Sequence, residues 1–298
     1  MKYSIVQESR RGTRHINEDR VGCWQAPDAL LMAVADGLGG HLHGEIAAHL
    51  AIECFGAAFL REARPKLADP ARFLARAMAA AHAAIVRQTE KLQLSDMPRT
   101  VLVACVVQDG YAYWSNVGDS RFYLLREGRV IARTRDDTLV QKLVDEGRIR
   151  EEAIASHPER NRLLQTLGGY QPPRPAGARV RLAKGDLLLL CSDGFWAPLS
   201  QRQLVHGFMV NPLEEAIPDL MALAETRAGS ECDNLSVVAM AWGEDEVPAD
   251  DPHTDPYYKL PTDVQDFTVT DLDLLRISDE DLEKAIAEIK AVLRKTAR

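Results

Sequence analysis

The sequence has 298 residues, of which 46% are hydrophobic and 27% are charged. Such a chain can bury a substantial core, in one large domain or in one domain with an appendage. It has no apolar run long enough to cross a membrane, and the first residues lack the apolar stretch of a secretion signal. We therefore expect a cytoplasmic protein without a membrane partner.

The negative charge is concentrated late in the sequence. Residues 243–298 hold 15 acidic and 7 basic residues, whereas the whole chain has 44 acidic and 36 basic residues. The part before residue 243 is therefore neutral overall. Neither part has the basic surplus typical of proteins that bind nucleic acids, so we expect no nucleic-acid partner.

Two long helices are expected in the first third of the chain. Residues Gly44–Glu62 repeat apolar side chains on one face at helical spacing. A second helix begins at Pro70, with Asp69 as its N-cap, and keeps an apolar face as far as Ala84. Each helix is expected to pack against a sheet.

Apolar runs of strand length alternate with these helices. The expected strands are Ala29–Ala35, Val101–Gln108, Tyr111–Val117, Arg121–Arg126, Asp186–Cys191 and Leu235–Ala241. Two later helices are expected near Gln201–Met209 and Leu213–Thr226. Between these groups, the polar segment Arg148–Arg160 is interpreted as an excursion that precedes a helix-like stretch over Asn161–Leu167.

The five cysteines form no C-x-x-C pair and lie mostly in apolar runs, which predicts buried, reduced thiols. None is followed by arginine six positions later, so the signature of cysteine-based phosphatases is missing. We therefore expect no covalent thiol mechanism. The nucleotide-binding pattern G-x-x-x-x-G-K-[ST] is missing as well.

The last part of the sequence has a different composition. Residues 244–261 include four prolines and six acids, which is typical of a linker. Farther on, apolar residues recur at spacings of three and four between Leu282 and Leu293, which predicts an amphipathic helix with Ser278 as N-cap. We therefore divide the chain into a main domain over 1–243, an acidic linker over 244–262 and a helical tail over 263–298. The tail is expected to dock on the main domain or on a partner protein.

Four aspartates stand where apolar runs end or beside glycine. They are Asp36 before Gly37, Asp119 after Gly118, Asp193 before Gly194, and Asp233 before Asn234. A carboxylate at the end of a strand lies at the edge of its sheet, and an adjacent glycine lets backbone carbonyls or water approach closely. Several acids without histidine or cysteine partners suit hard cations such as Mg²⁺ or Mn²⁺.

These aspartates belong to a series of motifs in a fixed order. The motifs are Gly12-x-Arg14-x-x-Asn17-Glu18-Asp19, Asp36-Gly37-Leu38-Gly39-Gly40-His41, Asn116-Val117-Gly118-Asp119-Ser120-Arg121, Leu167-Gly168-Gly169, Cys191-Ser192-Asp193-Gly194 and Asp233-Asn234. Over about residues 5–242 the chain thereby resembles the bacterial serine/threonine type of the metal-dependent protein phosphatases, the PPM or protein phosphatase 2C family. The resemblance implies an α+β fold, a four-layer αββα sandwich of two antiparallel sheets flanked by helix pairs.

The resemblance also implies roles for particular residues. Asp36 would bridge two metal ions, with the Gly37 carbonyl on the second ion and Asp193 and Asp233 on the first. Asp119 would hold a third ion together with Asp193, which gives two to three Mn²⁺ or Mg²⁺ ions per chain. Glu18 and Asp19 would act close by through metal-bound waters, and Arg14 would clamp the substrate phosphate with its planar fork.

The implied activity is hydrolysis of phosphoserine and phosphothreonine in proteins by metal-activated water, in signalling, on the substrates of a Ser/Thr kinase. Two alternatives stay open: a phosphoprotein-binding scaffold on an inactive phosphatase fold, and a hydrolase of small phosphometabolites. The chain departs from the family at Leu38, where some animal relatives have a histidine as general acid, and His41 and His43 come later. It also has Asp136-Asp137-Thr138 in place of the commoner Asp-His-Ser.

Overall fold

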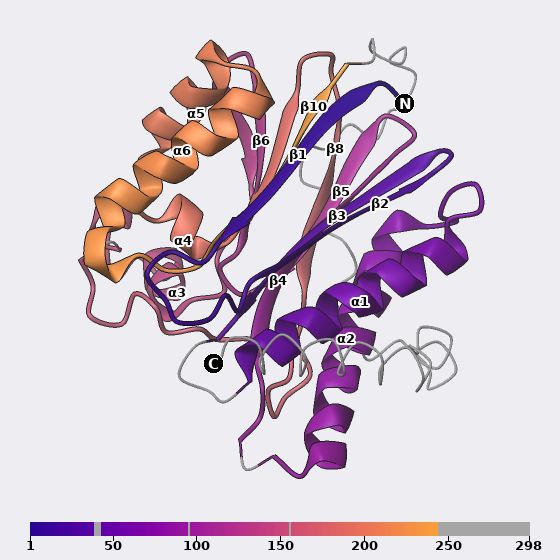
Figure 1. Ribbon diagram of the computed structural model, residues 1–298, viewed down its shortest axis with the longest axis vertical. Helices are drawn as coiled ribbons and strands as arrows, with labels where there is room; N and C mark the ends of the chain where they lie inside the picture. The colour runs from indigo at the N-terminus through magenta and orange to yellow at the C-terminus, as the bar shows by residue number, and fades with distance from the viewer. Residues whose placement is uncertain (39–42, 95, 155, 244–298) are drawn as a thin grey trace.

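The computed structural model describes residues 1–38, 43–94, 96–154 and 156–243. The predicted linker over 244–262, the predicted tail over 263–298 and His41 lie outside the described residues. In Figure 1, two sheets pack face to face, with α1 and α2 on one outer side and α4, α5 and α6 on the other. This is the four-layer αββα sandwich that the resemblance implied.

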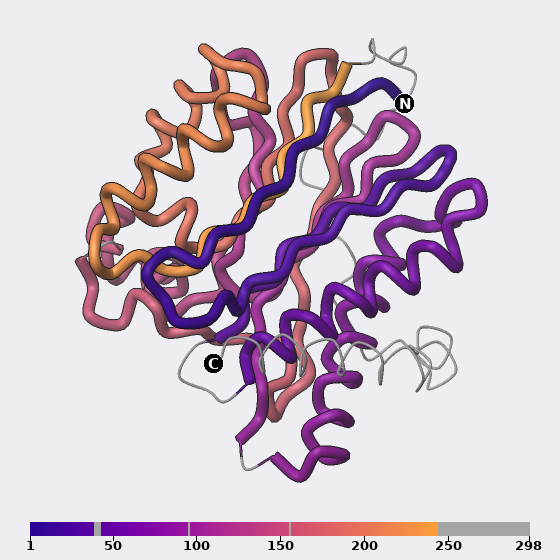
Figure 2. Tube along the Cα trace, in the orientation of Figure 1, coloured from indigo at the N-terminus to yellow at the C-terminus, as the bar shows by residue number. Residues whose placement is uncertain are grey.

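Both sheets are five-stranded and antiparallel. The first sheet has the order β1 (Tyr3–Arg10), β10 (Leu235–Trp242), β9 (Leu187–Cys191), β6 (Arg121–Arg126) and β7 (Arg129–Arg133). The second has the order β2 (Arg20–Ala26), β3 (Ala29–Gly37), β4 (Thr100–Gln108), β5 (Tyr111–Val117) and β8 (Ala176–Arg181). Figure 2 shows β1 running beside β10, so the two ends of the described chain share one sheet.

The four longest helices of the described chain, α1, α2, α5 and α6, follow the patterns read from the sequence. They are α1 (Gly44–Glu62), α2 (Pro70–Leu92), α3 (Leu139–Asp145), α4 (Asp193–Trp196), α5 (Gln201–Val210) and α6 (Leu213–Ala228), with 3-10 turns η1 (Glu151–Ala153) and η2 (Gly229–Glu231). The Asp69 side chain caps α2 by accepting a hydrogen bond from the Arg72 amide at 3.0 Å, as its N-cap position predicted. Each helix within the described ranges is too short or too polar to span a bilayer.

Three apolar layers hold the sandwich together. Along β3, Leu31, Ala33 and Ala35 face α1 and α2, whereas Leu30 and Met32 and their neighbour Val34 face the other sheet. A third layer lies between the first sheet and α4, α5 and α6. Because helices cover one face of β3 and a sheet covers the other, the strand is apolar along most of its length and not merely at every second position.

Two other sequence predictions can be checked here. The cysteines are free thiols, and all are buried except Cys23, which is half-buried. The helix expected over Asn161–Leu167 is wrong, because this stretch contains turns and two isolated bridges, Leu163 with Thr138 and Leu167 with Thr100. The bridges tie this segment to the start of β4 and to the residue before α3, so Leu163 and Leu167 serve tertiary contacts and not a helical face.

A test of the sandwich is to truncate Phe122, which is fully buried between the sheets. Its ring stacks on Trp114 of the other sheet with ring centroids 4.5 Å apart. We expect Phe122→Ala to lower the free energy of unfolding by about 3–5 kcal/mol in a urea titration, because it leaves a cavity. The control Leu60→Ala, at a position that is 53% exposed, should change it by less than about 0.5 kcal/mol. Equal losses in the two variants would contradict the packing described here.

Candidate active site

Strand pairing brings acidic residues from both sheets to one end of the sandwich. In the second sheet, Asp36 lies near the end of β3, and Asp19 comes just before β2, whose first residue Arg20 pairs with Ala35. Because neighbouring strands run in opposite directions, the end of one lies beside the start of the next. The two carboxylates are therefore held at the same sheet edge although 16 residues separate them in the sequence.

The first sheet repeats this arrangement with three more acids. Cys191, the last residue of β9, pairs with Val237 of β10 and with Arg121 of β6. As a result Asp193, which follows β9, lies at the same edge as Asp233 before β10 and Asp119 before β6. We call Asp19, Asp36, Asp119, Asp193 and Asp233 the acidic cluster.

Contacts between the sheets join the two halves of the acidic cluster. The Ser192 hydroxyl donates a hydrogen bond of 2.7 Å to Asp19 Oδ2, and Oδ1 of Asp19 has no hydrogen-bond partner although the side chain is only 2% exposed. Burial, followed by the repulsion of neighbouring aspartates, raises the pKa of Asp19 to about 7 despite that hydrogen bond. A buried acceptor atom without a donor is costly, so this oxygen is suited to a ligand.

The other members of the cluster repel one another. Burial and the charges of Asp19 and Asp193 raise the pKa of Asp36 well above its usual range. Burial also raises the pKa of Asp119 and of Asp193, with further contributions from neighbouring aspartates in each case. These carboxylates are partly open to solvent at the sheet edge, so the crowding of like charges is an essential part of the effect.

Asn234 fastens the segment that carries Arg14, Glu18 and Asp19. Its Nδ2 donates hydrogen bonds to the main-chain oxygens of Arg11, at 2.8 Å, and Ile16, at 3.0 Å, and its Oδ1 accepts from the Glu18 amide at 2.8 Å. The carboxyl of Glu18 is brought close to the cluster, and burial and the charge of Glu45 raise its pKa to about 7. The Asp233-Asn234 motif therefore supplies a carboxylate and, beside it, an amide that holds the Arg14 segment by hydrogen bonds.

Arg14 lies beside the cluster and is 54% exposed along its side chain. Its Nη2 donates to Asp233 Oδ2 at 2.7 Å, and this hydrogen bond raises the pKa of the guanidinium. One edge of the planar fork is thus used for positioning, while the exposed part of the group faces solvent. This places a fixed positive charge beside the acidic cluster.

Two glycines are required where the backbone approaches these acids. A Cβ on Gly37 would lie 2.5 Å from the Gly44 carbonyl oxygen and 2.8 Å from that of Glu18, so only glycine lets these segments meet next to Asp36. Gly118 has a φ of +96°, and a Cβ there would meet Val101 Cγ1 at 2.1 Å. The glycines in the motifs therefore serve close packing around the acids.

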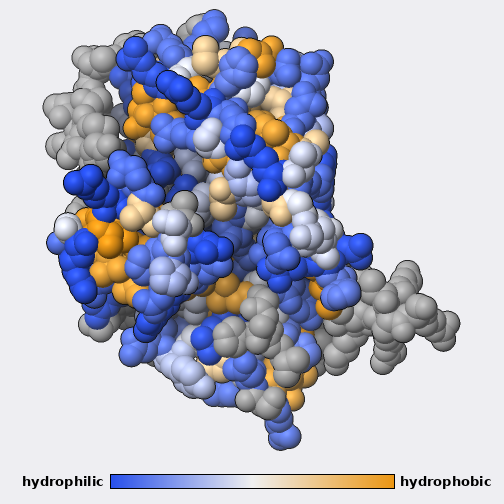
Figure 3. All heavy atoms as spheres, turned by 90° about the vertical axis from the view of Figure 1, so that its left-hand side faces the viewer, coloured by the Kyte–Doolittle hydropathy of each residue, from blue (hydrophilic) through white to orange (hydrophobic). Residues whose placement is uncertain are grey.

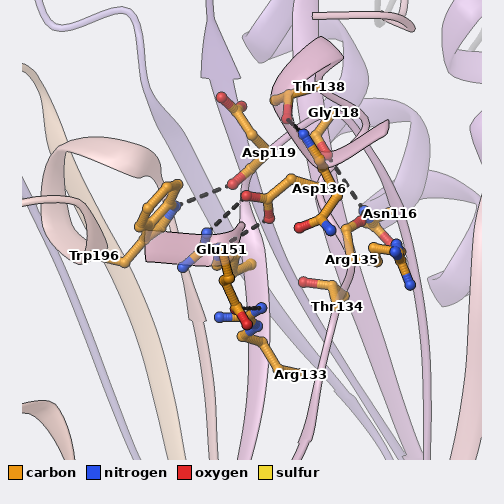
Figure 4. Close-up of polar contacts among 12 residues, drawn as sticks. Asn116, Gly118, Asp119, Arg133, Thr134, Arg135, Asp136, Thr138, Glu151 and Trp196 are labelled. Carbon is orange, nitrogen blue, oxygen red and sulfur yellow. Dashed lines mark hydrogen bonds and ion pairs between the residues drawn. The ribbon is translucent and has the colours of Figure 1, made fainter. Parts of the chain in front are cut away.

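A network that the sequence analysis missed positions Asp119. Trp196 Nε1 donates to the Asp119 main-chain oxygen at 3.0 Å, as Figure 4 shows. The Arg121 guanidinium lies 3.3 Å from the Trp196 ring centroid and forms a bidentate ion pair with Asp136, at 2.9 and 2.7 Å. Arg121 lay within a recognised motif, but nothing local to the sequence indicated that Trp196 would reach it.

The loop after β7 takes part in the same network. The Asp137 carboxylate accepts from the Gly118 amide at 3.0 Å, and its own amide donates to the Gly118 oxygen at 2.9 Å. The stretch Asp136-Asp137-Thr138, which departs from the family pattern, therefore contacts Gly118, the residue before Asp119. Thr138 caps α3 through a hydrogen bond of 3.2 Å from the Gln141 amide.

The residues of the cluster fit divalent cations by their chemistry. All donors are oxygens, they are crowded enough to repel, and Asp19 Oδ1 is buried without a partner. Within the described ranges, no three His, Cys, Asp or Glu side chains are already arranged closely enough to enclose an ion. His43, which follows the Asp36-Gly37 motif, has Nδ1 3.7 Å from Glu45 Oε1.

Comparisons with known proteins identify the family to which this chain belongs. A family model described as protein phosphatase 2C matches residues 6–227. The serine/threonine protein phosphatase PstP of Mycobacterium tuberculosis is 37% identical over 231 residues, which are 77% of this chain and 43% of PstP. A crystal structure of that phosphatase has a TM-score of 0.72 at 34% identity, covering 81% of this chain and 99% of the other.

This chain belongs to the protein phosphatase 2C family. A second structure, the PstP catalytic domain in complex with two manganese ions, has a TM-score of 0.68 at 32% identity and covers 81% of this chain and 99% of that one. The family is thus metal-dependent and its members include Ser/Thr phosphatases. The matched region spans less than half of the length of PstP, at 43%.

The crowding of the cluster predicts the pH dependence of the chelator-treated protein. Acids whose pKa is raised by folding stabilise the fold below their unfolded pKa, and this contribution is lost as the pH rises through the folded pKa. We expect the Tm in EDTA to fall between pH 5 and pH 8, and to fall less in Asp36→Asn. The control Asp109→Asn, at an exposed ion pair with Lys66, should keep the full decrease. An unchanged decrease in Asp36→Asn would contradict the repulsion described above.

Proposed function

We propose that this protein is a phosphoprotein phosphatase that hydrolyses phosphoserine and phosphothreonine with water activated by divalent cations. The observation that carries the proposal is the convergence of Asp36, Asp193 and Asp233, from separate strands of two sheets, at one end of the sandwich. Membership of a family that includes the Ser/Thr phosphatase PstP supports the choice of reaction.

We assign the cation ligands within the cluster. Asp36 is the ligand shared by two ions, the Gly37 carbonyl serves the second ion, and Asp193 and Asp233 serve the first. Asp119, with Asp193, holds a third. The two manganese ions of the PstP domain support two of these sites, and Mg²⁺ suits the same oxygen donors. When bound, such ions supply Lewis-acid charge that activates water and stabilises the phosphoryl oxygens.

Side chains around the ligands orient the substrate and water. Arg14 is the phosphate clamp, because its fork can bind two phosphate oxygens while Asp233 holds its other edge. Glu18 and Asp19 stand close to the ligands, and we assign them to act through metal-bound waters, one of which suits the buried, unpartnered Oδ1 of Asp19. Burial raises the pKa of both carboxyls to about 7, so either can carry a proton near neutral pH.

We propose the same division of the chain that its composition predicts. The catalytic domain comprises residues 1–243, followed by the linker 244–262 and the tail 263–298. All the assigned ligands precede residue 243, which supports this boundary. The partners are proteins phosphorylated by a Ser/Thr kinase, and the protein acts in signalling in the cytoplasm.

The ligand assignment is tested by Asp36→Asn. Removing the shared carboxylate should reduce Mn²⁺-dependent turnover of an aryl phosphate at least about a hundred-fold and weaken Mn²⁺ binding in calorimetry. Asp109→Asn should retain both properties. Activity that resists chelation, or a near-normal rate in Asp36→Asn, would overturn the mechanism. Faster turnover of sugar phosphates than of phosphopeptides would overturn the assigned substrate class.

The role of the clamp is tested at Arg14. We expect Arg14→Ala to lower kcat/KM on a phosphopeptide about a hundred-fold, because an electrostatic partner of the phosphate is lost. Arg14→Lys keeps the charge without the fork and should lose less. Both variants should bind Mn²⁺ as the unaltered chain does. Weakened Mn²⁺ binding with unchanged KM would instead assign Arg14 to positioning Asp233.

A further inference from the structure

An apolar hollow lies at the far end of the first sheet from the acidic cluster. It has a volume of about 750 Å³ and lies between α5 and the β6–β7 turn, with Gly128, Val130, Val205 and Met209 in its lining. A second hollow of about 200 Å³ shares Gly128, Val205 and Met209 with the first. We call the two together the α5 groove. Figure 3 views this side of the molecule, where hydrophobic patches are set among hydrophilic residues.

The α5 groove exposes an apolar side chain that packing within the described residues does not cover. Met209 lines both hollows and is 65% exposed, and the adjacent Val210, at the end of α5, is 58% exposed. A single exposed apolar residue is ordinary, but one that lines an apolar hollow and has a second exposed apolar residue beside it indicates a binding surface.

The groove is separate from the candidate active site. Asp119 precedes β6, whereas Gly128 follows its other end, so the strand runs between the two sites. None of the assigned cation ligands lines either hollow. A ligand in the groove would therefore not contact the reacting phosphate.

The main domain ends beside the groove. Ala241 of β10 lines the second hollow, and the next residue, Trp242, accepts a hydrogen bond of 2.9 Å from the Gly185 amide, also in that lining. The described chain thus ends at the groove. If the 34 residues 244–277 behave as a random coil, their r.m.s. length is roughly 30–35 Å, which gives the segment that they tether an effective concentration of order millimolar.

The segment that follows residue 277 has the chemistry that the groove requires. Its apolar residues between Leu282 and Leu293 recur at helical spacing, and a helix of these 12 residues would be about 18 Å long, close to the roughly 15 Å of α5. Acidic residues cluster at its start, from Asp279 to Glu283, whereas Arg129 and Arg202 line the groove. Helix-in-groove binding uses such an apolar face with a charged rim.

We propose that the α5 groove binds residues 278–293 of the same chain as an amphipathic helix. Leu282, Ile286 and Ile289 enter the apolar hollow beside Met209, and the acidic first turn lies toward the arginines. Intramolecular binding is favoured over a second copy because the tether starts at the groove. The tail is then a structural partner of α5, and turnover of small substrates is independent of it.

Hydrogen–deuterium exchange on the full chain tests this proposal. Amides of residues 278–293 should exchange at least about ten-fold more slowly than in a synthetic peptide of the same residues. Met209→Glu should remove this protection, since it places a charge in the groove at a position exposed enough to leave the domain folded. The matched control is Leu60→Glu, at a 53% exposed apolar position on α1, which should retain the protection.

A reciprocal variant keeps the test decisive if Met209→Glu disturbs α5 itself. Ile289→Glu in the tail should speed exchange in residues 201–210 and leave aryl-phosphate turnover within a few-fold of the unaltered chain. Tail amides that exchange at peptide rates, or protection that survives Met209→Glu in a folded protein, would overturn the proposal. Protection that disappears on dilution would also overturn it, in favour of a second copy. None of these outcomes depends on whether the phosphatase assignment is correct.

Discussion

The rest of the structure depends on the crowding of carboxylates at one end of a rigid sandwich. Asp36, Asp119 and Asp193 have raised pKa values because burial and their like charges oppose ionisation. A flexible scaffold would let such groups move apart. Here they lie at the ends of paired strands whose registers are held by two apolar layers and the inter-sheet core between them. Crowding of this kind lowers stability without a cation and favours binding of one.

Polar contacts between segments that are distant in sequence hold these carboxylates in place. Ser192 connects the end of β9 to Asp19, and Asn234 connects the start of β10 to the loop that carries Arg14. These contacts join the sheets at the site, where apolar packing cannot be used because the cluster must stay open to substrate. Trp196 gives Asp119 similar support from α4. Asp19 and Asp119 are thus each held by a neighbour that has no direct part in the proposed chemistry.

The two ends of the sandwich are suited to different tasks. One end gathers acids and exposes Arg14, whereas the other has the apolar groove beside α5 and the last residues of β10. The core between them is closely packed, with Phe122 and Leu190 fully buried. In the arrangement that we propose, a tail bound at the groove adds contacts to the α5 side without reaching the acids.

The sequence by itself determined the central strands and the two long helices, and it indicated the acids that the fold brings to one end of the sandwich. Strands β3, β4, β5, β6, β9 and β10 were predicted because neighbours on both faces make them rich in apolar residues. The four strands that it did not indicate, β1, β2, β7 and β8, are the edges of their sheets, and β7 alternates exposed with half-buried residues. An edge strand is held mainly by backbone hydrogen bonds to its one neighbouring strand, and these bonds leave little signal in the amino-acid composition.

Only the tertiary structure decided how the motifs act on one another. The motifs identified the acids, but Asp19 and Ser192 are 173 positions apart and meet only because β2 begins and β9 ends at the same side of the sandwich. The same holds for the contact of Trp196 with Asp119, and for the bridges that replaced the helix expected over Asn161–Leu167. Local patterns report how each segment is buried, whereas these contacts depend on which segments the sheets bring together.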